Sequence, residues 1–131
     1  MRNVKWFLVG VLISVVMVAC SEAIAHEMTP TYPKLRPSFA EDIYTTSIDL
    51  FNRRQDVEYY EVGIFDKDFK VVPFTTIYKI VKVSYLSKVN INVYIKAKDV
   101  NKAVYICSQS KIRKEQDVRT VVASRICSKF K

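Results

Sequence analysis

The sequence predicts an all-β protein: an antiparallel, immunoglobulin-like β-sandwich of about seven or eight strands after an N-terminal signal segment. Three observations support this prediction. Short runs rich in Val, Ile, Tyr and Phe recur along the chain, several of them alternate apolar with polar residues, and no long segment has the 3.6-residue period of a helix. A small closed barrel is the alternative arrangement of such strands.

The first 19 residues have the layout of a secretory signal. Residues 1–5 carry two positive charges and no acid, and an uncharged apolar run of 14 residues follows from Trp6 to Ala19. A helix that crosses a bilayer needs about 20 apolar residues. We therefore predict an export signal over residues 1–19, with an uncleaved anchor helix as the alternative.

Two cleavage sites follow the apolar run. Residues 17–20 (M-V-A-C) resemble the lipobox of bacterial lipoproteins, which is cut before the cysteine, so that Cys20 would carry the lipid. Residues 23–25 (A-I-A) fit the small-x-small rule of ordinary signal peptidase, and a cut after Ala25 would release a soluble periplasmic protein. We favour lipidation, because Cys20 directly follows the apolar run. Ser21 then resembles an outer-membrane sorting signal, and we expect an outer-membrane lipoprotein facing the periplasm.

The mature chain divides into a tether and one domain. Residues 20–33 contain two prolines and no hydrophobic period, which predicts a tether, and residues 34–131 form the predicted sandwich. The clearest strand is 89–98, where Val89, Ile91, Val93 and Ile95 alternate with polar residues and are expected to point inward. The other predicted strands are 42–51, 57–66, 69–72, 77–85, 102–108 and 118–127.

The cysteines predict a disulfide bond. Cys20 lies at the signal boundary, which leaves Cys107 and Cys127 as an even pair in an exported protein. A hairpin that places Cys107 opposite Cys127 would bring the two thiols within bonding reach. Metal binding is the weaker alternative, because two thiols without a nearby histidine or third cysteine make a poor zinc site.

Positive charge is concentrated in the last quarter of the chain. Residues 20–95 hold nine Lys and Arg against ten Asp and Glu, whereas residues 96–131 hold ten against three. Export argues against a nucleic-acid partner, so we expect an acidic target in the envelope, or a solvated surface with no target. The predicted partner-binding residues of this basic hairpin are Lys111, Arg113, Lys114, Arg119 and Arg125.

No motif for catalysis is present. The single histidine, His26, falls in the predicted tether, and the sequence has no G-x-S-x-G, no glycine-rich phosphate loop and no C-x-x-C. The carboxylates at Glu58 and Glu61 have opposite strand parity and would face opposite sides. We therefore expect no enzyme activity, no cofactor, no metal and no small-molecule substrate.

Residues 33–110 resemble the N-terminal immunoglobulin-like domain of periplasmic pilus chaperones of the chaperone–usher class. The resemblance rests on a basic first strand, K-L-R at 34–36, followed by the strands at 47–54, 57–66 and 88–95. It implies that Arg36 holds a carboxylate of a partner protein. The second domain of those chaperones has no counterpart in this sequence, and the cysteine pair is a further difference.

These features favour a non-catalytic protein-interaction module of the bacterial envelope, held to the membrane by its N-terminal lipid and binding an envelope protein. Such a module would contribute to a surface, secretion or pilus assembly. The alternatives are a single-domain periplasmic chaperone-like assembly factor, a phage- or plasmid-encoded surface-exclusion lipoprotein, and an inhibitor of a wall-degrading enzyme. Strand addition at an open sheet edge is the expected mode of binding.

Overall fold

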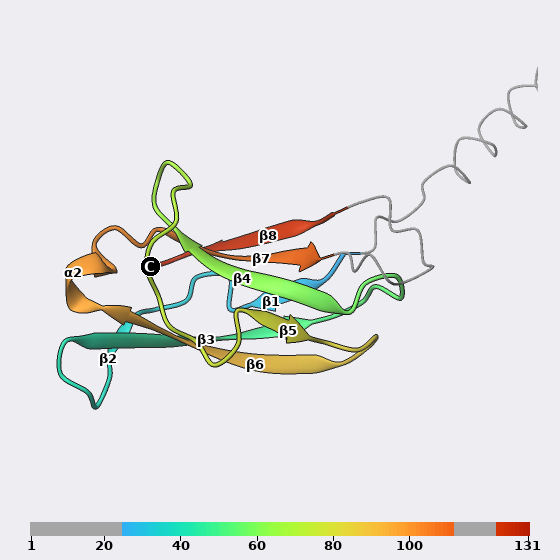
Figure 1. Cartoon of the computed structure of the whole chain (residues 1–131), viewed down its shortest axis with the longest axis horizontal. Coiled ribbons are helices and arrows are strands. Elements are labelled where there is room, and N and C mark those ends of the chain that lie inside the picture. Colours follow the sequence, from blue (N-terminus) through green and yellow to red (C-terminus); the bar gives the residue numbers. More distant parts are fainter. Residues whose placement is uncertain (1–24, 112–122) are drawn as a thin grey trace, which may run out of the picture.

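Two antiparallel sheets pack face to face in the computed structural model, which describes residues 25–111 and 123–131 (Figure 1). The predicted all-β sandwich is therefore confirmed. Its elements are β1 (Glu27–Thr29), β2 (Arg36–Pro37), β3 (Ile43–Phe51), β4 (Tyr59–Phe65), β5 (Ile80–Lys82), β6 (Lys88–Lys96), the short helix α2 (Ala97–Val100), β7 (Tyr105–Lys111) and β8 (Arg125–Lys129).

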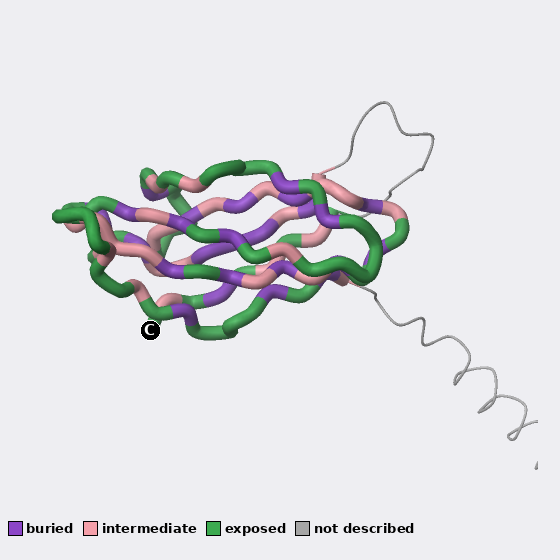
Figure 2. Tube along the Cα trace, turned by 90° about the horizontal axis from the view of Figure 1, so that it is seen from below, coloured by how far each residue is buried: buried purple, intermediate pink, exposed green. Residues whose placement is uncertain are grey.

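The first sheet is built around β3. Strand β6 pairs with β3 along its whole length, from Ile43 opposite Lys96 to Phe51 opposite Lys88, while β1 and β2 pair with the other side of β3. The second sheet has the order β5-β4-β7-β8. Buried residues alternate with less buried ones along β3, β4 and β6, as Figure 2 shows, because successive side chains of a strand point to opposite faces. In β7 the three successive residues Ile106, Cys107 and Ser108 are all buried.

The core lies between the two sheets. Ile48 and Leu50 of β3, Ile64 of β4 and Ile106 of β7 are completely buried. On β6, Ile91, Val93 and Ile95 face inward as the alternation predicts. Each fully buried side chain of this kind contributes about 1.5–3 kcal/mol relative to an exposed one.

Two predicted strands are much shorter than expected. The segment 69–72 retains only the isolated bridge between Phe65 and Val71. The segment 77–85 is reduced to β5, because the chain changes sheets there: Thr75 pairs with Tyr94 of the first sheet, whereas the carbonyl of Lys79 accepts the N–H of Val62 in the second. A chain that crosses between two sheets cannot form one continuous strand.

The predicted tether over residues 20–33 is wrong from His26 onward. Strand β1 pairs with β3, Met28 joins the core, and His26 is only 1% exposed. Pro33 is also fully buried, and its carbonyl accepts the N–H of Lys131 at 3.1 Å. The sequence does not reveal this strand, because three paired residues are too few to produce an apolar alternation and two prolines follow them.

The predicted disulfide is present between neighbouring strands. Cys107 of β7 lies opposite Cys127 of β8, and their sulfur atoms are 2.06 Å apart. Cys107 is buried and Cys127 is exposed, so the bond fastens the edge strand β8 to the interior of its sheet.

Candidate interaction surface

The edge of β3 is open between β1 and β2. Thr29 lies opposite Asp49 in the first pairing, and Arg36 lies opposite Thr45 in the second. The N-terminal segment thus advances seven residues while β3 covers four, so three extra residues bulge away from the sheet. We call this interruption the split edge; on β3 it covers residues 46–48.

Two prolines explain why the segment leaves β3. Pro30 and Pro33 have no N–H to donate to a strand ladder. The segment instead lies against the end of β8, where the Pro33 carbonyl accepts the Lys131 N–H. It returns to β3 only at Arg36.

The split edge leaves the backbone of Ser47 open. The carbonyl of Ile43 accepts the N–H of Ser38 at 2.8 Å, so Ile43 directs its polar groups toward β2. Because polar groups alternate sides along an antiparallel strand, those of Ser47 point the same way. Within the described residues neither β1 nor β2 has a residue paired with Ser47, and its side chain is exposed. This is one residue of free edge, bounded by paired backbone on both sides.

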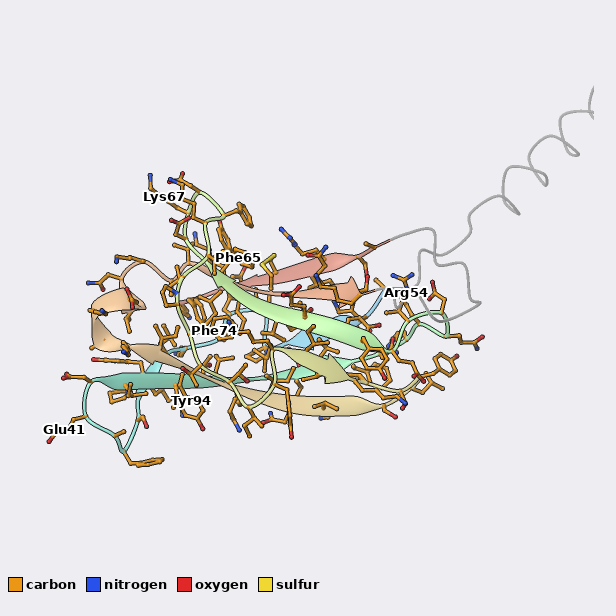
Figure 3. All side chains as sticks on the ribbon, in the orientation of Figure 1. Glu41, Arg54, Phe65, Lys67, Phe74 and Tyr94 are labelled. Carbon is orange, nitrogen blue, oxygen red and sulfur yellow. A yellow bond between two sulfur atoms is a disulfide. The ribbon has the colours of Figure 1, made fainter. Side chains whose placement is uncertain are left out.

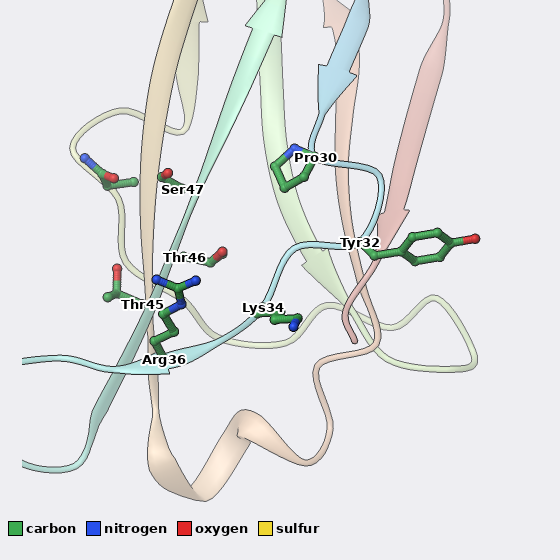
Figure 4. A pocket seen from close by; sticks show the side chains of 8 residues that line it. Pro30, Tyr32, Lys34, Arg36, Thr45, Thr46 and Ser47 are labelled. Carbon is green, nitrogen blue, oxygen red and sulfur yellow. The ribbon is translucent and has the colours of Figure 1, made fainter.

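A groove of about 560 Å³ follows the split edge (Figure 4). Lys34 and Arg36 border it, and Arg36 is directed toward Thr46 in the figure. The full lining consists of Pro30, Tyr32, Lys34, Arg36, Thr45, Thr46, Ser47 and Asn92. The lining combines two cations with hydroxyl and amide groups and contains no acid, which suits a carboxylate or another anionic group.

Charge is distributed unequally between the two ends of the sandwich. At the end where the N-terminal segment enters, the described cations have acidic partners: Arg53 with Glu27, Arg54 with Asp56, Lys82 with Glu58, Lys88 with Asp49 and Lys111 with Glu61. Toward the other end, Lys102 pairs with Asp99 and Lys67 with Asp68, whereas Lys34, Arg36, Lys96 and Lys98 have no ion pair among the described residues and are exposed. The two cations of the groove, Lys34 and Arg36, therefore have no acidic partner in the described part of the chain.

The predicted partner-binding residues do not form one cluster. Lys111 of β7 is ion-paired with Glu61. Arg125 of β8 donates to the side chain of Gln109 at 2.8 Å and lies over the ring of Phe65. Arg36 lies in the other sheet, at the groove. Arg113, Lys114 and Arg119 lie outside the described residues.

Lys34 lies at the groove although the sequence did not predict it as a contact residue. The sequence could have predicted it, because residues two positions apart on an extended segment lie on the same face. In K-L-R at 34–36, Lys34 and Arg36 are two positions apart. The open backbone at Ser47 had no such signal, since it depends on where two short pairings begin and end.

A second polar cluster is buried around His26. Its Nε2 lies 2.7 Å from Oγ of Ser108, and its Nδ1 lies 3.1 Å from Oγ of Ser124. The ring contacts that of Tyr60 at a centroid distance of 4.6 Å, and Arg54 also donates to Oγ of Ser124 at 3.2 Å. Both ring nitrogens are therefore occupied inside the fold, and the cluster joins the N-terminal segment to β7 and to the start of β8.

Burial lowers the pKa of His26 below its ordinary value of 6.5, hydrogen bonding to Ser108 opposes this, and the positive charge of Arg54 adds to it. The unfolded chain then binds a proton more readily than the folded protein. The stability that the neutral imidazole confers is present above pH 6.5 and is lost as the pH falls from there toward the folded-state pKa. Each tenfold difference in proton affinity is worth about 1.4 kcal/mol.

We expect the urea concentration at the unfolding midpoint to be lower at pH 5.5 than at pH 7.5. The variant His26→Gln is the control: it should be less stable at pH 7.5 but nearly insensitive to pH over this range. A wild-type midpoint that stays constant, or rises as the pH falls, would contradict the assignment.

Among residues 25–111 and 123–131, no group of three or more His, Cys, Asp or Glu side chains is placed to hold a metal ion. In the same part of the chain, no helix has the length and apolar character needed to cross a bilayer.

No protein-family model and no curated protein sequence matches the chain. Among solved structures, the crystal structure of the E. coli chaperone DraB is similar, with a TM-score of 0.64 and 10% sequence identity over 82% of this chain. A FixG-related protein from Vibrio parahaemolyticus is similar with a TM-score of 0.37 and 14% identity, covering 80% of this chain and 94% of that one.

The match covers 53% of the DraB chain, so this protein spans about half the length of that chaperone. At 10% identity the likeness concerns the fold alone. The remote resemblance to a chaperone domain of the chaperone–usher class, predicted from the sequence, is confirmed at that level.

Proposed function

We propose that the protein is a non-catalytic interaction module of the bacterial cell envelope, which binds an acidic segment of another envelope protein at the split edge. One observation carries the proposal: Lys34 and Arg36, without acidic partners among the described residues, line a groove together with Ser47, the residue of β3 that neither β1 nor β2 pairs with. A partner segment could pair with Ser47 while its carboxylates meet the two cations.

The same proposal includes an anchor. The lipobox-like residues 17–20 support lipidation of Cys20 and an outer-membrane lipoprotein facing the periplasm. The disulfide between Cys107 and Cys127 supports an oxidising compartment such as the periplasm.

A chaperone-like assembly factor is the second candidate. The likeness of the fold to DraB favours it, and so does the position of Arg36 beside an open edge. If the protein is a chaperone, the groove would hold a carboxylate of the protein that it helps to fold. The resemblance to pilus chaperones implies this role for Arg36. The two candidates differ in the lifetime of the complex, which is stable for an assembly component and transient for a chaperone.

Charge reversal at the groove tests the proposal. The double variant Lys34→Glu and Arg36→Glu should reduce recovery of a cross-linked envelope partner by at least about tenfold, because both cations would be replaced by repelling charges. The matched control is Lys67→Glu with Lys70→Glu, which makes the same change of charge on the exposed connection between β4 and β5.

A third variant separates the groove from the basic hairpin. It reverses Lys111, Arg113 and Lys114 to glutamate. If the groove variant recovers as much partner as the wild type and the hairpin variant recovers less, the partner binds at the hairpin and the groove is refuted.

A further inference from the structure

The N-terminal segment enters the sandwich at a defined end. Glu27 lies opposite Phe51, and Phe51 on its other side lies opposite Lys88, so β1 begins where β3 ends and β6 starts. The turns 52–58 and 84–87 lie at this same end, as Figure 1 shows. We call it the entry end.

The covalent chain limits how far the entry end can lie from a lipid on Cys20. Cys20 lies five positions before Ala25, where the described chain begins. A fully extended chain spans at most about 3.6 Å per residue, which gives a reach of roughly 18 Å. An anchored protein must therefore keep its entry end within that distance of the bilayer surface. An uncleaved apolar segment over residues 1–19 would impose the same limit.

The turn 84–87 presents two large apolar side chains at the entry end. Tyr85 is 43% exposed and Leu86 is 59% exposed. Leu86 has a positive φ of 55°, which is uncommon for a residue with a branched side chain. Neither side chain is covered by the described part of the fold.

The backbone of this turn is held firmly. The N–H of Leu86 donates to the carbonyl of Asn52 at 2.8 Å, and the N–H of Asn52 donates to the carbonyl of Ser87 at 3.0 Å. The N–H of Ser87 closes the turn on the carbonyl of Ser84 at 3.0 Å. Because Asn52 is completely buried, the two apolar side chains stand on a rigid base. Figure 3 shows the turns of the entry end at the opposite extremity from the loop that carries Glu41.

The charges around the turn are compensated. Lys88 pairs with Asp49 at 3.2 Å, Lys82 with Glu58 at 3.4 Å, and Arg53 with Glu27 at 2.9 Å. A tyrosine and a leucine on a polar but nearly neutral rim match the boundary between headgroups and acyl chains, where tyrosine is enriched. Within the described residues, the unpaired cations Lys34 and Arg36 lie at the groove and not at this turn.

We propose that the turn 84–87 is a membrane contact, in which Tyr85 and Leu86 enter the headgroup boundary of the bilayer that holds the lipid on Cys20. This inference rests on the lipid anchor included in the proposed function. It orients the sandwich with its long axis away from the membrane. The groove then lies about 20 Å further out, since Thr45 is six positions from Phe51 along β3 and each position adds about 3.4 Å.

A single-tryptophan experiment tests the contact. Trp6 is the only tryptophan and lies in the predicted signal, so the mature chain has none. The mature protein carrying Leu86→Trp is reconstituted in phosphatidylcholine vesicles with brominated acyl chains. We expect its emission to shift to the blue and to lose about half its intensity relative to unbrominated vesicles, because interfacial groups sit 5–10 Å into the boundary.

The matched control is Phe39→Trp, which replaces a fully exposed aromatic residue in the connection between β2 and β3. Its emission should be the same in both kinds of vesicle. Tyr85→Trp serves as a second reporter if Leu86→Trp does not fold. Flotation of the vesicles separates the two proposals. If the protein floats with the vesicles but tryptophan at 85 and at 86 is not quenched, the membrane contact is refuted and the anchor stands. If the protein does not float, both the anchor and the contact are refuted.

Discussion

Replacing Asn52 with alanine is expected to destabilise the sandwich by about 4 kcal/mol, because four buried polar groups would lose their partner at once. Nδ2 of Asn52 donates to the carbonyls of Val57 at 2.7 Å and Val83 at 2.9 Å. Its Oδ1 accepts the N–H of Arg54 at 2.8 Å and the hydroxyl of Tyr60 at 2.6 Å. The side chain is completely buried and uses its full hydrogen-bonding capacity.

The measurement is urea unfolding of the wild type, Asn52→Ala and the control Asn90→Ala. Asn90 is exposed and donates to Asp49 at 2.7 Å, so its loss should cost less than about 1 kcal/mol. Equal effects of the two variants would show that the buried network around Asn52 is not a main support of the fold. Asn52→Asp should also destabilise strongly, since a carboxylate would face two carbonyl oxygens.

Burial in the same network also changes the pKa of Tyr60. Desolvation raises the pKa of Tyr60 to about 12, and the nearby positive charge of Arg54 opposes the shift. The hydroxyl of Tyr60 therefore remains a hydrogen-bond donor to Asn52 throughout the physiological range. Tyr60 is a buried core residue in this protein and is not part of an exposed aromatic surface.

Removing the disulfide is expected to lower the free energy of unfolding by about 3 kcal/mol, the value that the chain-entropy model gives for a closed loop of this size. The bond joins residues 20 positions apart and holds the edge strand β8. The double variant Cys107→Ser with Cys127→Ser should show this loss in urea unfolding without reductant.

Reductant provides the internal control for this prediction. It should lower the midpoint of the wild type to a value close to that of the double variant, and it should leave the variant unchanged. A wild type that is insensitive to a reductant shown by mass to have opened the bond would contradict the expected contribution.

The strands with long uninterrupted pairing could be predicted from the sequence. β3, β4 and β6 each run for at least seven residues, long enough for apolar alternation to exceed chance. The disulfide could be predicted as well, because an even pair in an exported chain has one pairing available. In these cases local pattern and tertiary structure agree, since the side chains that alternate are those that the opposite sheet covers.

The N-terminal segment shows where local pattern fails. The same two prolines that predict a tether also produce the split edge, because they interrupt the pairing of β1 and β2 with β3. His26 is buried because Ser108 and Ser124, more than eighty residues away in the sequence, supply hydroxyls for both of its ring nitrogens. No local rule identifies such distant partners.

The sequence by itself thus determined the fold class, the long strands and the cysteine pair, all of which depend on residue type and on spacing within one element. The tertiary structure alone decided that residues 26–33 belong to the sandwich, that Ser47 has an open edge, and which cations are neutralised. The physical reason is that pairing register and ion-pair partners depend on contacts between distant segments, so Lys111 is neutralised by Glu61 while Lys34 and Arg36 remain available at the groove.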